Sequence, residues 1–82
     1  MNLKDKVVVI TGAGSGIGAA TAKLFGVNMA NVIVSDINLE SAEKVASEIR
    51  NDGGTASALQ TDVTQFEQVK ELLQKVIQKY GS

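Results

Sequence analysis

The strongest constraint on the fold is an apolar run near the N-terminus that stops at a glycine-rich segment. Residues 7–10 read VVVI, and residues 11–18 read TGAGSGIG. A short run of β-branched residues is typical of a parallel strand that is covered on both faces. Glycines permit a tight turn and let backbone N–H groups approach a ligand closely. The sequence therefore predicts a buried strand followed by a loop suited to a ligand.

Apolar runs and helical patterns alternate along the rest of the chain. The predicted strands are 7–10, 32–34 (which runs on into Ser35-Asp36) and 55–59, the last mainly because the alternation requires one. The predicted helices are about 16–25, about 39–51, and a third that follows Thr64. The order βαβαβα implies an α/β fold with a parallel sheet and right-handed crossovers.

Each helical pattern also predicts a buried face and a boundary. Asn38 is a candidate N-cap and Gly53 a candidate stop for the second helix, and Thr64-Gln65-Phe66-Glu67 is typical of a capping box. The predicted apolar faces are, in chain order, Ile17, Ala20 and Leu24; Leu39, Ala42, Val45, Ala46 and Ile49; and Phe66, Val69, Leu73, Val76, Ile77 and Tyr80.

Composition bounds the kinds of function that this chain can have. A net charge of -1 over 82 residues gives no electrostatic case for nucleic acid or an anionic membrane surface. We find neither an apolar run near the roughly 18 residues of a membrane span nor the apolar region of a signal peptide. Because cysteine and histidine are both absent, we expect no disulfide and no transition-metal site. We expect one domain in the cytoplasm.

The glycine segment joins the end of a predicted strand to the start of a predicted helix. A helix N-terminus offers unpaired N–H donors and a partial positive charge, so it favours an anion such as a pyrophosphate. The βαβ context is the one that a dinucleotide-binding loop requires. The simpler alternative is a tight turn with no ligand.

Asp36 ends the second predicted strand, where a carboxylate can accept hydrogen bonds from a ribose diol. It would also repel a 2′-phosphate, and neither Ser15 nor Ile37 supplies a positive charge to attract one. The residues therefore favour NAD(H) over NADP(H). The alternative is a solvated aspartate that caps the next loop.

Asp62 and Val63 follow the third predicted strand and should reach the same edge of the sheet. An adenine could lie against Val63 while Asp62 accepts a hydrogen bond from its amino group. Alternatively, the two residues merely lead into the next helix.

Taken together, these motifs resemble the N-terminal half of the short-chain dehydrogenase/reductase family, classical type. The resemblance covers nearly the whole chain, and it implies a half Rossmann fold with strand order 3-2-1. It implies three groups of binding residues: Gly12, Ser15, Gly16, Ile17 and Gly18 at the pyrophosphate, Asp36 and Ile37 at the adenosine ribose, and Asp62 and Val63 at the adenine. The family usually has glycine where this chain has Met29, so we expect either Asn28 to take the left-handed conformation or the helix to end early at Gly26.

The family's chains are considerably longer, and the catalytic serine and Tyr-x-x-x-Lys motif of that family are absent here. We therefore predict an NAD(H)-binding half-domain over residues 1–82 that is not an enzyme by itself. In the family's strand order the first strand is central, whereas here residues 7–10 become a hydrophobic edge that invites self-pairing. We expect a homodimer through this edge. The alternatives are a self-assembling fragment with an empty loop, and one half of an oxidoreductase that a second chain completes.

Overall fold

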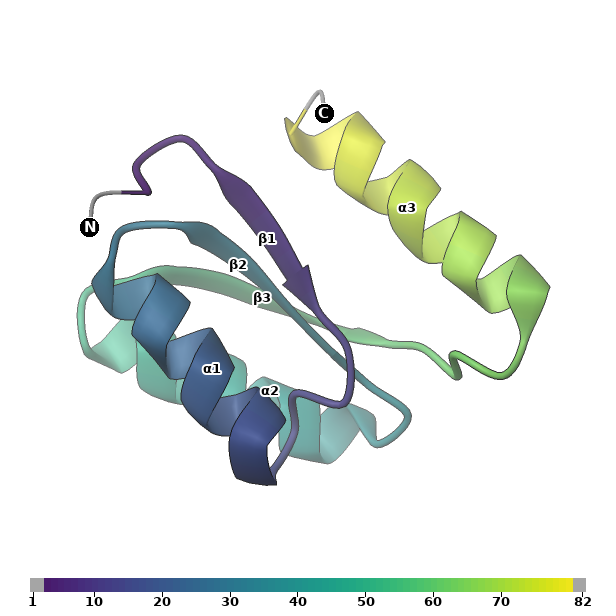
Figure 1. Ribbon diagram of the computed structural model, residues 1–82, viewed down its shortest axis with the longest axis horizontal. Helices are drawn as coiled ribbons and strands as arrows, with labels where there is room; N and C mark the ends of the chain where they lie inside the picture. The colour runs from purple at the N-terminus through teal and green to yellow at the C-terminus, as the bar shows by residue number, and fades with distance from the viewer. Residues whose placement is uncertain (1–2, 81–82) are drawn as a thin grey trace.

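The computed structural model describes residues 3–80, which form strands and helices in strict alternation (Figure 1). The chain continues beyond this range by two residues at each end. The elements are β1 (Val7–Ile10), α1 (Gly16–Val27), β2 (Asn31–Asp36), α2 (Leu39–Asn51), β3 (Thr55–Gln60) and α3 (Phe66–Tyr80). None of the helices within residues 3–80 is long and apolar enough to cross a membrane.

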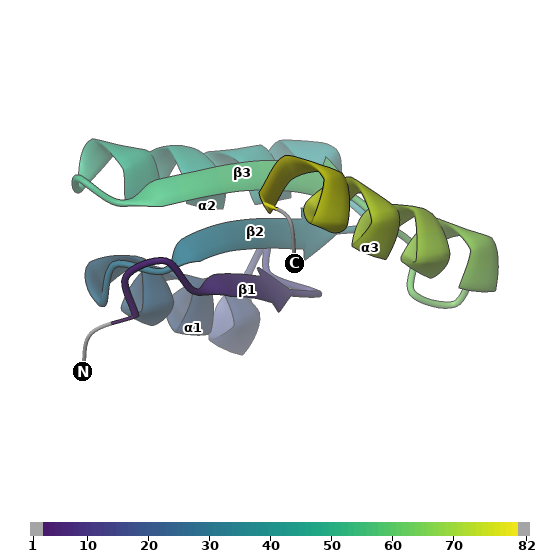
Figure 2. The same ribbon diagram turned by 90° about the horizontal axis from the view of Figure 1, so that it is seen from above.

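The three strands form a parallel sheet in the order β1-β2-β3, with β2 in the middle. Helices α1 and α2 cover one face of the sheet, and α3 lies on the other face (Figure 2). This arrangement confirms the predicted α/β class, the three-stranded parallel sheet and its order. Val32, Ile33 and Val34 in β2 are fully buried because β2 has a strand on each side and helices on both faces.

The core consists of a larger and a smaller cluster, one on each face of the sheet. The larger cluster joins Val32 and Val34 of β2 to the buried face of α2 and to Ala19 and Ala22 of α1. The smaller cluster joins Ile33 to Leu72 and Val76 of α3. Most of the apolar burial therefore lies between the sheet and the first two helices.

The predicted buried face of α1 is wrong. Ile17 and Leu24 are 87% and 58% exposed, and the buried residues of the helix are Ala22 and Gly26. A Cβ at Gly26 would lie 2.7 Å from the Cγ2 of Ile49, so α1 meets α2 through small residues. The prediction chose the face with the large apolar residues, whereas the close packing of α1 against α2 requires small side chains.

Helix α2 agrees with its predicted boundaries. The Asn38 side chain accepts a hydrogen bond from the Ser41 N–H at 3.0 Å, and Gly53 has a φ of 90° just after the helix. The predicted stripe is buried except at Leu39, which is 46% exposed.

Helix α3 begins one residue later than the capping box predicts. The Thr64 hydroxyl donates to Asp62, and the helix starts at Phe66, so the box is not formed. Leu72 and Val76 are buried, whereas Leu73 and Ile77 of the predicted stripe are about half exposed. The side chains of Phe66 and Tyr80 lie outside the described part of the chain.

The end of α1 differs from both predicted alternatives. The helix continues past Gly26 to Val27, and Asn28 has a φ of -91°. Met29 itself takes the left-handed conformation, with a φ of 75°. The Met29 N–H donates to the carbonyl of Gly26 at 3.1 Å, so backbone bonding holds the residue in a conformation that its side chain disfavours.

Candidate functional site

The residues predicted to bind a cofactor lie in three segments at the C-terminal ends of β1, β2 and β3, and Asp36 is itself the last residue of β2. Because the strands are parallel and adjacent, the three segments meet at one edge of the sheet, where ligands of such folds bind. The first segment leads into α1, and the second precedes α2. The residues concerned are Gly12, Ser15, Gly16, Ile17, Gly18, Asp36, Ile37, Asp62 and Val63.

The loop between β1 and α1 needs glycine for two different reasons. Gly12 and Gly16 have φ values of 63° and 59°, a region that residues with side chains rarely occupy. A Cβ at Gly18 would lie 2.3 Å from the carbonyl oxygen of Gly12, which is backbone and cannot turn aside. The loop and the first turn of α1 are therefore packed against each other.

The N-terminal turn of α1 is open to a ligand. Ser15 precedes the helix in an extended conformation, and within the described residues its side chain makes no capping hydrogen bond. Ser15, Gly16 and Ile17 are all exposed. The first N–H groups of a helix have no acceptor within the helix, so this turn offers donors and a partial positive charge to an anion.

Asp36 lies where β2 ends, and both of its carboxylate oxygens accept backbone hydrogen bonds. The N–H of Gly14 donates to Oδ2 at 2.9 Å, and the N–H of Asn38 donates to Oδ1 at 3.0 Å. The Asn38 N–H, and then the Gly14 N–H, hold the pKa of the Asp36 carboxyl below its ordinary value. Asp36 is therefore negatively charged near neutral pH.

The third segment is organised around Asp62. Its Oδ1 accepts from the Thr64 N–H at 2.9 Å and from the Thr64 hydroxyl at 2.6 Å, and these bonds lower the pKa of the carboxyl. The Asp62 N–H donates to the Oε1 of Gln68 at 2.9 Å. Val63 beside it is 56% exposed, which leaves its apolar side chain available to a flat ring.

Sequence reasoning missed three residues of this edge. Gly14 contacts Asp36 across 22 positions, Gln68 holds Asp62, and the Gln60 side chain donates to the carbonyl of Ile37 at 3.1 Å. The last bond joins the ends of β2 and β3. The only available signal was the place of Gly14 in the glycine motif, because the partners of the two glutamines are set by tertiary structure.

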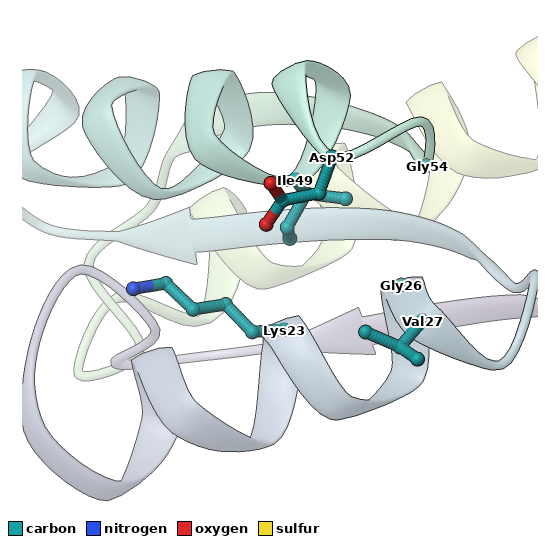
Figure 3. A pocket seen from close by; sticks show the side chains of 6 residues that line it. All are labelled: Lys23, Gly26, Val27, Ile49, Asp52 and Gly54. Atoms are coloured by element: carbon teal, nitrogen blue, oxygen red, sulfur yellow. The ribbon is translucent and has the colours of Figure 1, made fainter.

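A cleft between the C-terminal turns of α1 and α2 lies away from this edge (Figure 3). Its lining includes Lys23, whose ammonium group pairs with the carboxylate of Glu48. That pairing lowers the pKa of the Glu48 carboxyl. None of the predicted binding residues lines the cleft, which consists of Lys23, Gly26, Val27, Ile49, Asp52 and Gly54.

A parallel βαβαβα sheet with a glycine loop and an ionised aspartate at its strand ends defines a protein of the Rossmann class. The family model for short chain dehydrogenases matches residues 6–82. The chain therefore belongs to the short-chain dehydrogenase family.

Known members of the family extend the comparison to sequence and structure. The 3-oxoacyl-[acyl-carrier-protein] reductase FabG of Thermotoga maritima is 43% identical over 99% of this chain, and the match covers 33% of that protein. An oxidoreductase of Haemophilus influenzae with bound NAD has a TM-score of 0.92 at 38% identity, over 99% of this chain and 29% of that one. A metagenomic short-chain oxidoreductase in complex with NADP has a TM-score of 0.93 at 32% identity, over 96% of this chain and 36% of that one. The chain spans about a third of the length of these relatives.

Proposed function

We propose that this chain is an NAD(H)-binding half-domain over residues 1–82, which holds the AMP and pyrophosphate part of the cofactor. The observation that carries the proposal is the meeting of the open N-terminal turn of α1 with the ionised Asp36 at one sheet edge. The N–H groups of the helix turn can bind phosphate oxygens, and the Asp36 carboxylate can accept hydrogen bonds from hydroxyl groups. The family relationship supports a nicotinamide dinucleotide, since relatives bind NAD or NADP.

Each predicted residue has a role in this proposal. Gly12, Ser15, Gly16, Ile17 and Gly18 surround the pyrophosphate, Asp36 and Ile37 the adenosine ribose, and Asp62 and Val63 the adenine. The preference for NAD(H) rests on Asp36, because a 2′-phosphate at the ribose would bring negative charge next to its carboxylate.

We propose that the chain by itself does not transfer hydride. Proton transfer to the reacting oxygen needs a positioned acid or base beside the nicotinamide. The catalytic serine and the Tyr-x-x-x-Lys motif of the family have no counterpart in these 82 residues. A chain that supplies them could complete an oxidoreductase, and turnover after mixing with such a fragment is the test. The cytoplasmic location stays a prediction.

The test of cofactor binding is a calorimetric titration of NAD⁺ into the purified chain, with NADP⁺ as competitor. We expect a dissociation constant in the micromolar to millimolar range for NAD⁺, weaker binding of NADP⁺, and a loss of affinity in Asp36→Ala. Asp52→Ala removes an exposed carboxylate near the cleft between α1 and α2, and it serves as the matched control. An absence of binding at millimolar NAD⁺ would overturn the proposal and favour a fragment with an empty loop.

The free side of β1 supports a second proposal, which is a homodimer. Within residues 3–80, β1 pairs with β2 alone, and its four residues are all apolar. Leu24 and Val27 of α1 and Leu73 and Ile77 of α3 are more than half exposed. Antiparallel pairing of two β1 strands would extend the sheet and bring α1 and α3 of one copy toward α1 and α3 of the other.

A further inference from the structure

We propose that Asp36 is a positioning residue for the glycine loop, which holds the loop through the Gly14 N–H before any ligand binds. The inference rests on the proposed function, because it concerns the same pyrophosphate site. It has a consequence of its own: among variants that lack the negative charge, one without an acceptor for the Gly14 N–H should bind phosphate ligands that contain no ribose more weakly than one that keeps it.

The carboxylate of Asp36 bridges two turns that are distant in sequence. Gly14 lies in the loop after β1, and its N–H donates to Oδ2 at 2.9 Å. Asn38 lies in the turn before α2, and its N–H donates to Oδ1 at 3.0 Å. Hydrogen bonds to a charged acceptor are stronger than neutral ones, so the bridge fixes the loop relative to the end of β2.

The packing around Gly14 supports the same role. A Cβ at Gly14 would lie 2.7 Å from the Cβ of Ser41 and 2.9 Å from the Oδ2 of Asp36. Ser41 is fixed in turn, because its N–H donates to the side chain of Asn38 at 3.0 Å. The backbone of the loop therefore rests directly on the end of β2 and the first turn of α2.

A second hydrogen bond also attaches the glycine loop to β2. The Ala13 N–H donates to the carbonyl of Ser35 at 2.9 Å, so adjacent residues of the loop bond to adjacent residues of β2. The Ala13 bond joins two backbone groups and does not depend on side chains. The Gly14 bond depends on one carboxylate, and it lies closer in sequence to the helix N-terminus that would receive the anion.

The bridge does not exclude a ligand from Asp36. An ionised carboxylate has about four acceptor positions, and the bonds from Gly14 and Asn38 leave capacity on both oxygens. One aspartate can therefore hold the loop and also accept hydrogen bonds from a ribose.

The pH behaviour of the bridge follows from its donors. The groups that act on the pKa of Asp36 in the described structure are the backbone N–H groups of Asn38, Gly14 and Ile37, which lower it, and partial burial, which raises it. No charged side chain of β1, α2 or β3 is among them. The Gly14 N–H should consequently report the protonation of Asp36 directly, at a pH below the ordinary pKa of an aspartate carboxyl.

The first experiment uses the full chain without ligand, labelled with ¹⁵N. We expect the amide proton of Gly14 to shift as the pH falls below the ordinary pKa of an aspartate carboxyl, and this shift to vanish in Asp36→Asn. In Asp36→Ala, hydrogen exchange at Gly14 should accelerate about tenfold, as expected for the loss of one charge-assisted hydrogen bond. Asp36→Asn should retain part of the protection because its side-chain oxygen still accepts. Asp52→Ala is the matched control and should leave Gly14 unchanged.

The second experiment titrates inorganic pyrophosphate, which has no ribose. Both Asp36→Ala and Asp36→Asn remove the negative charge, and only Asp36→Asn keeps an acceptor for the Gly14 N–H, so we expect Asp36→Ala to bind pyrophosphate several-fold more weakly than Asp36→Asn does. The inference is overturned if Gly14 exchange is unchanged in Asp36→Ala, or if that variant binds pyrophosphate as tightly as Asp36→Asn does. If the parent chain binds neither NAD⁺ nor pyrophosphate, the proposed function fails, and the Gly14 measurements still decide whether Asp36 holds the loop.

Discussion

The two edges of the sheet are built from different residues. The β3 edge carries small and polar residues such as Thr55, Ser57 and Gln60. Side chains of this chain also cover it: Nη1 of Arg50 donates to the carbonyl of Ala56 at 2.9 Å, and the Lys79 ammonium donates to the Ser57 hydroxyl at 2.7 Å. Polar residues and covering side chains are the usual protection of a strand that ends a sheet.

The β1 edge has none of these features within the described residues. Its sequence is VVVI, all four residues are only half-buried, and exposed apolar residues occupy the helices on both faces of the sheet. A strand edge of this kind presents unpaired backbone groups on which a further strand can pair. The comparison teaches that the β3 edge is complete in this chain, whereas the β1 edge is suited to a partner strand.

The largest expected effect comes from charging the helices that flank the β1 edge. We expect Leu24→Lys combined with Ile77→Lys to raise the dimer dissociation constant roughly 100-fold, because each dimer loses two copies of two apolar side chains, at about 0.7 kcal/mol each for side chains that the monomer already buries in part. Both side chains are more than half exposed, so the monomer should stay folded. Sedimentation velocity over a concentration series measures the change.

The control places the same charge at the other edge. Thr55→Lys adds a lysine at an exposed position of β3 and should leave the association unchanged. The homodimer is ruled out if the parent chain sediments as a monomer at high micromolar concentration. If Thr55→Lys weakens association as much as the two lysines beside β1 do, the β1 edge is not the specific site of association.

The next largest effect concerns the close packing of Gly54, just before β3, against Ile49 of α2. A Cβ at Gly54 would lie 2.7 Å from the Cγ2 of Ile49 and 3.1 Å from its carbonyl oxygen. Gly54→Ala should therefore lower the free energy of unfolding by about 2 kcal/mol through overpacking, and it should leave association unchanged. Urea unfolding measures it, with the exposed Thr55→Ala as control. A change below about 0.5 kcal/mol would show that α2 can move away from β3 at low cost.

A smaller effect of opposite sign is expected at Met29. Because Met29 adopts a φ of 75°, Met29→Gly should raise the free energy of unfolding by about 1 kcal/mol. Asn28→Gly is the matched control: its φ is -91°, and its side chain donates to the carbonyl of Leu24 at 2.8 Å, so that change should destabilise. Thermal unfolding of the two variants separates them, and a destabilised Met29→Gly would mean that the Met29 side chain makes contacts that outweigh the strain.

The elements of the fold could be predicted from the sequence more fully than the faces that they bury. The first two strands and the start and end of α2 follow from local patterns, because β-branched runs and capping residues act over a few positions. The third strand follows from the alternation of strands and helices, and the strand order from the family resemblance. The buried faces of α1 and α3 do not follow from such patterns. Leu24 and Ile77 fit an apolar periodicity, yet both are more than half exposed. Periodicity shows that a face is apolar, and only the fold shows whether this chain covers it.

The candidate site divides in the same way. The glycine loop and Asp36 were predictable because a strand, a glycine motif and a following helix specify both in sequence. The bond between Gly14 and Asp36 was not, since 22 residues separate the partners and it depends on the β1–β2 register. The conformation of Met29 was missed because we assumed that the chain would avoid the strain.

The smallest effect tests whether Arg50 protects the β3 edge. Arg50→Met keeps much of the aliphatic length of the side chain and removes the donor to the carbonyl of Ala56, so we expect a loss of about 1 kcal/mol in unfolding free energy. Glu43→Gln removes only the carboxylate that pairs with Arg50 at the surface, and it should cost less than about 0.5 kcal/mol. Chemical denaturation measures both. If Arg50→Met also promotes association, the carbonyl of Ala56 is a group that a second strand can use, and the β3 edge depends on this one side chain for its protection. If association is unchanged, the polar composition of β3 is sufficient, and the two edges differ in their strands rather than in the residues that cover them.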